Sequence, residues 1–219
     1  TSKINIITME KKGFINKFFQ NAGKPEGFLG RMILRGMNKG HAPLSRWARS
    51  CLVWQPEWNT LDIGCGGGAN LSEILKLCPQ GKVHGIDISQ ESVAFAQKKN
   101  MKHLGTRCFV DQGSADRLPY ADNSFDVVTA FETIYFWGDL HRAFIEVKRV
   151  LKDNGFFLIC CEASDPTNET WTSRIEGMVV HPSSELKYIL AQSGFTNITL
   201  HRKNKEDLCI VAQKQSSNN

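Results

Sequence analysis

The sequence lacks the features of a membrane-spanning or exported chain. None of its apolar runs approaches the roughly 20 residues that cross a bilayer, and the opening TSKINIITMEKK has no long apolar stretch of the signal-peptide kind. We therefore expect no transmembrane segment and a cytoplasmic location. Hydrophobic residues still make up 41% of the 219 residues, which is enough for a substantial core and excludes a disordered chain.

The chain also lacks a C-x-x-C pattern, and its seven cysteines are an odd number. These two facts favour reduced thiols over a disulfide framework. No Cys/His group has the spacing of metal ligands, so we expect no bound metal. An arsenic-methylating site would need several thiols around one ion. Adjacent Cys160 and Cys161 should instead point to opposite faces of a strand.

The net positive charge of the chain comes from its N-terminal part. Residues 1–58 hold ten Lys/Arg and three Asp/Glu, a balance of +7 within a total of +5. FINKFFQ and FLGRMILRGM have apolar residues at helical spacing, so residues 1–57 are predicted to form a helical lid. The basic segment leaves RNA or DNA open as an alternative substrate. Because nothing in it resembles an RNA-binding module, a nucleic-acid partner is not the expectation.

From residue 58 onward, buried strands alternate with helices, the pattern of a parallel sheet covered on both faces. The clearest helix, 140–151, has one apolar face and is expected to end at Asn154-Gly155. The last two strands follow each other too closely for a parallel crossover, so they must be antiparallel neighbours. The expected strands are 59–64, 82–89, 106–113, 124–132, 155–163, 196–203 and 207–214, and the other expected helices are 69–78, 90–105 and 184–195.

TLDIGCGGGAN places a glycine-rich loop at the end of the first strand. Glycine permits positive φ and lets a ligand approach the backbone, and the next helix offers free N–H groups. Asp87 ends the second strand, where an acid can accept hydrogen bonds from ribose hydroxyls. The loop also satisfies a dinucleotide pattern. Asp62, placed to orient the turn and reach a cationic amine, and the closing hairpin argue against a dinucleotide.

TLDIGCGGG, GIDIS, QGSADRLPYADNSFDVV and the closing hairpin together resemble the class I S-adenosylmethionine-dependent methyltransferases of the type 11 or UbiE-like group. The resemblance covers residues 58–213 and leaves 214–219 as a polar tail. It implies a Rossmann-like seven-stranded α/β sheet in the order 3-2-1-4-5-7-6, with the last strand antiparallel. It also implies a methyl transfer from S-adenosylmethionine to a small-molecule acceptor, in a monomer or homodimer.

The resemblance assigns the methionine moiety to the glycine loop, the ribose to Asp87 and the adenine to the segment after the third strand. This chain departs from the family at that segment, because Ser114 stands where an acid commonly binds the adenine amino group, and Asp116 is the substitute. The cofactor-binding residues implied are Asp62, Gly64, Cys65, Gly66, Asp87, Ile88, Ser114, Ala115, Asp116 and Phe131.

Two residues are candidates for catalysis. Glu132 is the only charged group in AFETIYFW and follows Phe131 at the end of the fourth strand, where it can anchor or deprotonate an acceptor. His41, in MNKGHAPLSRW, can act as a base. A cap or ion pair for Glu132 and a structural role for His41 stay open. If neither residue is catalytic, a cofactor-binding protein without turnover also remains an alternative.

Overall fold

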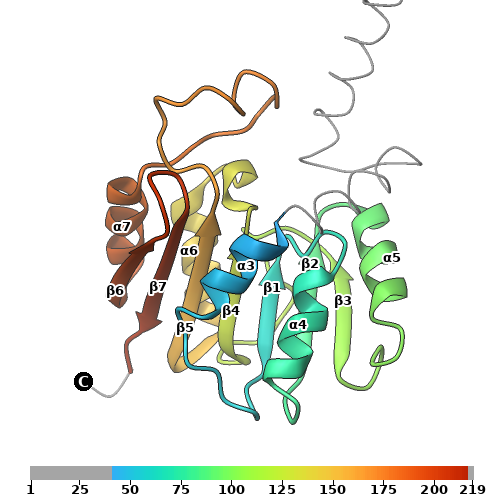
Figure 1. The fold of residues 1–219 in the computed structure, drawn as a ribbon. Coiled ribbons are helices and arrows are strands. Elements are labelled where there is room, and N and C mark those ends of the chain that lie inside the picture. The colour runs from blue at the N-terminus through green and yellow to red at the C-terminus, as the bar shows by residue number, and fades with distance from the viewer. Residues whose placement is uncertain (1–40, 217–219) are drawn as a thin grey trace, which may run out of the picture.

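The structure, a computed structural model, describes residues 41–216. Most of the predicted helical lid therefore lies outside the described residues. A seven-stranded sheet with the order β3-β2-β1-β4-β5-β7-β6 forms the centre of the molecule (Figure 1). The strands are β1 Thr60–Ile63, β2 Val83–Asp87, β3 Cys108–Gln112, β4 Phe125–Phe131, β5 Leu151–Cys161, β6 Phe195–Arg202 and β7 Leu208–Lys214.

The strand order and directions confirm the predicted topology. Strands β1 to β5 pair in parallel, and β7 runs antiparallel to both β5 and β6. The parallel strands place their carboxyl ends at one edge of the sheet, where ligands bind in open α/β folds. The helices are α3 Ala42–Arg49, α4 Ala69–Leu77, α5 Gln90–Lys99, η1 Ile134–Phe136, α6 Leu140–Val150 and α7 Ser183–Gln192.

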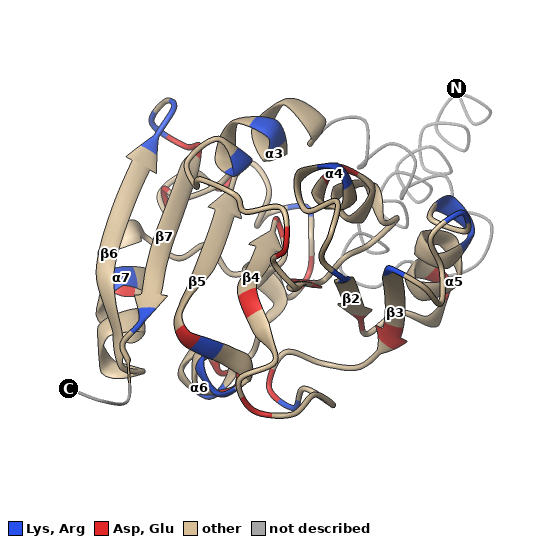
Figure 2. Cartoon of the chain, turned by 90° about the horizontal axis from the view of Figure 1, so that it is seen from below, with Lys and Arg blue, Asp and Glu red and all other residues tan. Residues whose placement is uncertain are grey.

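Helices cover both faces of the sheet and bury two separate apolar clusters. On one face α3, α4 and α5 pack over residues such as Val83 and Cys160. On the other face α6 and α7 pack over residues such as Val128 and Cys161. The two adjacent cysteines thus point to opposite faces, as predicted. Figure 2 shows few Lys, Arg, Asp or Glu residues along the central strands, in agreement with strands that are buried on both faces.

Two of the helix ends that differ from the sequence expectation have a clear local cause. The helix that begins at Leu140 ends at Val150, ahead of Asn154-Gly155, because β5 begins at Leu151. Asn154, with φ of 63°, lies where the β4–β5 register shifts. Helix α5 ends at Lys99, because Asn100 turns its side-chain amide to the backbone oxygens of Gly68 and Ala96, both at 3.0 Å.

Candidate active site

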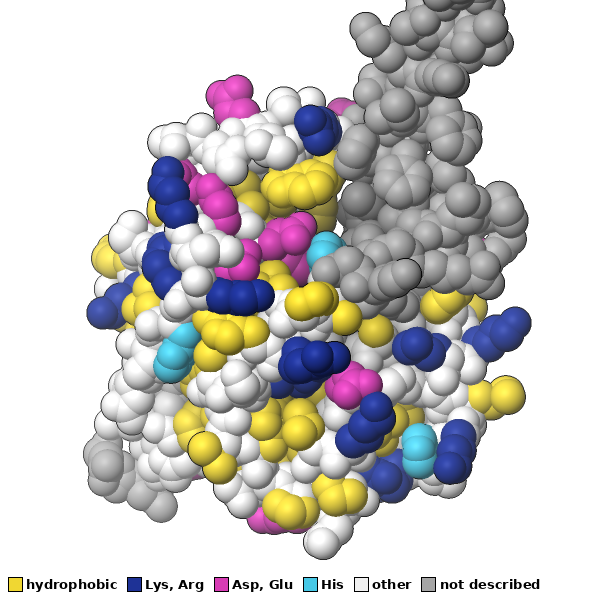
Figure 3. Space-filling model, in the orientation of Figure 1, with side chains coloured by type: hydrophobic (Ala, Val, Ile, Leu, Met, Phe, Trp, Pro, Cys, Tyr) yellow, Lys and Arg dark blue, Asp and Glu magenta, His cyan; other side chains and the backbone are white. Residues whose placement is uncertain are grey.

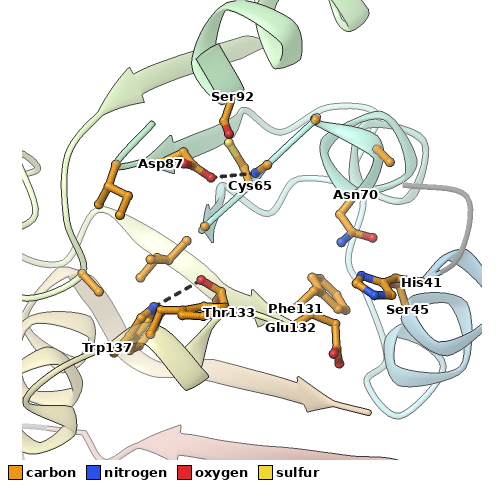
Figure 4. A pocket seen from close by; sticks show the side chains of 18 of the residues that line it. His41, Ser45, Cys65, Asn70, Asp87, Ser92, Phe131, Glu132, Thr133 and Trp137 are labelled. Carbon is orange, nitrogen blue, oxygen red and sulfur yellow. Dashed lines mark hydrogen bonds between the residues drawn. The ribbon is translucent and has the colours of Figure 1, made fainter. Parts of the chain in front are cut away.

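A cavity of about 530 Å³ opens at the carboxyl ends of β1, β2 and β4, with α3 along one side (Figure 4). Its size falls within the range of roughly 300–1,000 Å³ that is usual for small-ligand pockets. All site residues predicted from the sequence line this cavity, with the exception of Asp62. The fold therefore collects at one place residues that are distributed between His41 and Glu132 in the chain.

The glycine loop between β1 and α4, which includes Cys65 and Gly66, lines the cavity. Gly64 has φ of 71°, and a Cβ atom added to it would lie 2.0 Å from Oγ1 of Thr133. Gly68 also has φ of 71°, and its added Cβ would lie 2.8 Å from the Cα atom of Ala96. Only glycine avoids both the unfavourable backbone and the collisions. The bare backbone is thereby left open to a ligand.

Asp87 connects the end of β2 to the glycine loop. Its Oδ2 accepts a hydrogen bond from the Gly66 amide and its Oδ1 accepts one from the Ser89 amide, both at 2.9 Å. Burial raises the pKa of Asp87, and the two amides oppose that shift. Each carboxylate oxygen has further acceptor capacity toward the cavity. The exposed apolar side chain of Ile88 adjoins it. The arrangement suits a ligand with vicinal hydroxyls next to an apolar ring.

The turn after β3 presents Ser114, Ala115 and Asp116 to the cavity. The Ser114 hydroxyl donates a hydrogen bond to the Asp116 carboxylate. The departure from the family pattern therefore consists of two side chains that act as a pair. Arg142 lies 3.8 Å from the Asp116 carboxylate on its outer side. The pair keeps an acceptor in the turn where the family commonly has an acid.

Asp62 lies beneath the loop, away from the cavity wall. It is only 1% exposed, and its Oδ1 accepts a hydrogen bond of 2.7 Å from the Thr129 hydroxyl. Burial raises the pKa of Asp62 to about 7, against the opposing effects of Thr129 and Arg49. Its side-chain hydrogen bond is with β4, and any effect of Asp62 on a ligand passes through the glycine loop.

Phe131, Glu132 and His41 form the other end of the cavity (Figure 4). Phe136 also lines the cavity, and Trp137 lies across the view from His41, where its indole donates a hydrogen bond of 3.3 Å to the Thr133 hydroxyl (Figure 4). Burial, together with the neighbouring Glu162, raises the pKa of Glu132 well above its usual range. A carboxyl group at this place can anchor a polar acceptor or exchange a proton with it.

Sequence reasoning missed a buried arginine. Arg49, on α3, lines the cavity, donates a hydrogen bond of 2.6 Å to Asn70 and lies 5.8 Å from the ring centre of Phe131. Its sequence signal was the basic N-terminal segment, which was interpreted only as a solvated lid surface or nucleic-acid contact. Trp47, on the same helix, does not line the cavity and packs against the apolar cluster beneath α3.

The strand order, the glycine loop at the carboxyl edge and the acid at the end of β2 together define a class I, Rossmann-like methyltransferase fold. The comparison with protein families agrees. Residues 61–159 match the family described as "Methyltransferase domain". The chain is similar to this methyltransferase family over a little less than half of its length.

Relatives of known name are similar over part of their length. The demethylmenaquinone methyltransferase of Symbiobacterium thermophilum is 29% identical over 165 residues, which cover 72% of this chain and 62% of that protein. An uncharacterized methyltransferase of Schizosaccharomyces pombe is 33% identical over 111 residues, 48% of this chain and 39% of that protein. The chain thus spans less than two thirds of the length of these relatives.

Solved structures share the fold. A SAM-dependent methyltransferase from Aquifex aeolicus superimposes with a TM-score of 0.69 at 19% identity, covering 82% of this chain and 96% of the other. Human N-acetylserotonin methyltransferase, solved in complex with SAM, superimposes with a TM-score of 0.69 at 16% identity. The match covers 85% of this chain and 56% of the human chain. Within residues 41–216, no helix has both the length and the apolar composition that a membrane crossing requires.

Proposed function

We propose that this protein transfers a methyl group from S-adenosylmethionine to a small-molecule acceptor. The observation that carries the proposal is the hydrogen bond from the Gly66 amide of the glycine loop to Asp87, in the lining of a cavity of about 530 Å³. The methyltransferase relatives support it. When bound, S-adenosylmethionine supplies an electrophilic methyl group on a sulfonium ion. Nearly all other requirements of the reaction are alignment and exclusion of water.

The cavity residues divide into cofactor and acceptor ends in this proposal. Asp87 accepts hydrogen bonds from the ribose hydroxyls, and the Ser114–Asp116 pair faces the adenine. The open backbone of Gly64 and Gly66 holds the methionine moiety. Arg49 lines the cavity, donates a hydrogen bond to Asn70 on the helix that follows this loop, and is suited to pair with the cofactor's carboxylate.

Phe131 and Phe136 give the acceptor end an apolar, aromatic wall. Such a wall fits a flat organic ring, and a quinol is the first candidate, since a similar relative is named a demethylmenaquinone methyltransferase. The buried carboxyl group of Glu132 beside this wall anchors or deprotonates the acceptor's polar atom. Glu132→Gln should therefore reduce turnover more than it reduces cofactor affinity.

Calorimetry with S-adenosylhomocysteine and with NAD tests the cofactor assignment. We expect saturable binding of S-adenosylhomocysteine alone. Asp87→Ala should weaken it by roughly 1–3 kcal/mol, because ribose hydroxyls lose their partner and the Gly66 amide is released. Glu169→Ala changes an exposed acid outside the cavity lining, and this control should leave affinity unchanged. Saturable NAD binding, or full affinity in a folded Asp87→Ala variant, would contradict the proposal.

An acceptor screen that measures release of S-adenosylhomocysteine tests the reaction itself. The screen should include quinols, phenols, amines and thiols, with a total RNA fraction in parallel. Turnover with a small molecule is the expected result. Methylation confined to the RNA would favour the nucleic-acid alternative. Cofactor binding without turnover on any acceptor would favour a binding protein.

A further inference from the structure

Three side chains from separate elements meet at the edge of the cavity. His41 precedes α3, Glu132 follows β4 and Glu162 follows β5. One ligand atom of each lies within 4.8 Å of the other two. The Nε2 atom of His41 is 3.4 Å from Oε1 of Glu162. Figure 3 shows acidic side chains gathered beside a histidine above the strand ends. The three residues are far apart in the chain, which is why ligand spacing in the sequence did not reveal them.

Glu132 is held in an unusual conformation. Its φ is 58°, a left-handed value that non-glycine residues rarely adopt, and the residue is only 9% exposed. Its Oε2 accepts a hydrogen bond of 3.2 Å from the Tyr135 hydroxyl. That hydroxyl in turn accepts one of 3.0 Å from the Ala163 amide. Since Tyr135 is held by the Ala163 amide, Glu132 is oriented by the segment after β5 that also carries Glu162.

One oxygen of this carboxyl group lacks a partner. Oε1 of Glu132 is buried and makes no hydrogen bond within the described chain. Among residues 41–216, neither Glu132 nor Glu162 forms an ion pair with a lysine or arginine, and the contact of Glu162 is with His41. A buried carboxyl oxygen without a hydrogen-bond partner is costly. Two carboxyl groups and an imidazole that face one another without a cation are a typical set of metal ligands.

We propose that His41, Glu132 and Glu162 bind a divalent metal ion through one nitrogen and two oxygen atoms. Zinc suits this donor set, and its bonds of about 2.0–2.2 Å place tetrahedral ligand atoms roughly 3.4 Å apart. His41 and Glu162 already have this separation. Three protein ligands leave a coordination position open, as in catalytic zinc sites. Because His41 and Glu132 line the cavity, that position faces the acceptor end.

This proposal replaces the expectation of no metal drawn from sequence spacing. The site suits an acceptor that offers an oxygen or nitrogen atom to the metal, and in this respect it rests on the proposed methyl transfer. Metal binding itself does not, because it requires neither cofactor nor acceptor. A failure of one proposal therefore leaves the other standing.

Titration of the metal-free full-length protein with Zn²⁺ and Mn²⁺, without cofactor, tests the site. We expect one equivalent of Zn²⁺ to bind, more tightly than Mn²⁺. Glu162→Gln and His41→Ala should each weaken binding at least about tenfold, the effect usual even for groups that only support a ligand. Circular dichroism establishes that each variant is folded. If one of them fails to fold, the other decides.

The matched control is Glu185→Gln. His181 and Glu185 form a second histidine–carboxylate contact, of 3.2 Å, without another acid in the group, so this change should leave affinity unaltered. Co²⁺ provides a spectroscopic test. A tetrahedral visible spectrum without thiolate charge transfer is expected, because the ligands are nitrogen and oxygen.

Several results would overturn the metal site. Absence of binding up to millimolar Zn²⁺ and Mn²⁺ is one. Full affinity in both ligand variants is another, as is a cobalt spectrum with thiolate bands. Binding of an organic amine that depends on Glu162 while metals do not bind would assign the carboxylates to a cationic acceptor instead.

Discussion

Gly64 and Gly105 share a left-handed backbone conformation, with φ of 71° and 75°, but differ in their surroundings. A Cβ atom on Gly64 would strike Thr133, whereas one on Gly105 would meet nothing within 4 Å. Gly105→Ala should therefore cost only the backbone strain, about 1–2 kcal/mol. Gly64→Ala should cost several kcal/mol and abolish S-adenosylhomocysteine binding, because the loop must move.

Urea unfolding and calorimetry of the two variants measure this difference. Gly105→Ala serves as the matched control for backbone strain without a collision. Equal destabilisation of both variants, with cofactor binding intact, would mean that the Gly64–Thr133 contact does not shape the cavity.

Asp62 should make stability depend on pH. Its pKa is about 7 in the folded chain, above the ordinary value of 3.8 that an unfolded chain retains. Between these pH values the folded state binds the proton and the unfolded state does not. The free energy of unfolding therefore falls as pH rises from about 4 to 7 and levels off above 7. Ionisation of Asp62 lowers the free energy of unfolding by up to about 4 kcal/mol over this range.

The Asp62→Asn variant removes that contribution, and of the other buried acids in residues 41–216 only Asp87 interacts with the Asp62 charge. Urea unfolding at several pH values should show wild type losing stability relative to the variant as pH rises through this range. A constant difference would show that the carboxyl group ionises normally beneath the loop.

Helix α3 shows how one element serves both the core and the site. Leu44 and Ala48 face the sheet and are buried, whereas Ser45 and Arg49 line the cavity. Leu44→Ala should destabilise the protein by about 2–4 kcal/mol and weaken S-adenosylhomocysteine binding, because the helix that carries Arg49 loosens. Denaturant unfolding and calorimetry measure the two effects.

Val53→Ala is the control for this prediction, since Val53 is 78% exposed and the change should stay within about 0.5 kcal/mol. Unaltered cofactor affinity in a destabilised Leu44→Ala variant would separate α3 from the binding site.

Strand periodicity predicted the sheet because its signals are local. The apolar runs, the loop glycines and the short final connection each lie within a few residues of one another. The cluster of His41, Glu132 and Glu162 has no such signal, since it exists only after three elements have packed. The position of Arg49 in the cavity could not be predicted for the same reason. Its partner Asn70 belongs to α4, and only the fold turns a basic surface residue into a buried cavity residue.

At the scale of the whole molecule, the boundary between the predicted lid and the core is testable. Residues 41–58 are part of the packed structure. Ala48 is fully buried, the Trp54 indole donates a hydrogen bond of 2.9 Å to the Arg49 carbonyl, and Trp58 packs against Phe156. The sequence placed residues 1–57 in the lid, but a cut through this region would remove α3 from the sheet. The structure therefore favours a cut before His41.

Two truncations distinguish these boundaries. A chain without residues 1–40 should unfold cooperatively, since it keeps every described element, and should bind S-adenosylhomocysteine more weakly if the predicted lid covers the cavity. A chain without residues 1–50 loses Leu44, Ala48 and Arg49 together. It should unfold at a lower urea concentration, expose apolar surface that binds a hydrophobic dye, and lose cofactor binding. Full cofactor affinity in the shorter chain would remove α3 from the site, and failure of the longer one to fold would place core residues before His41.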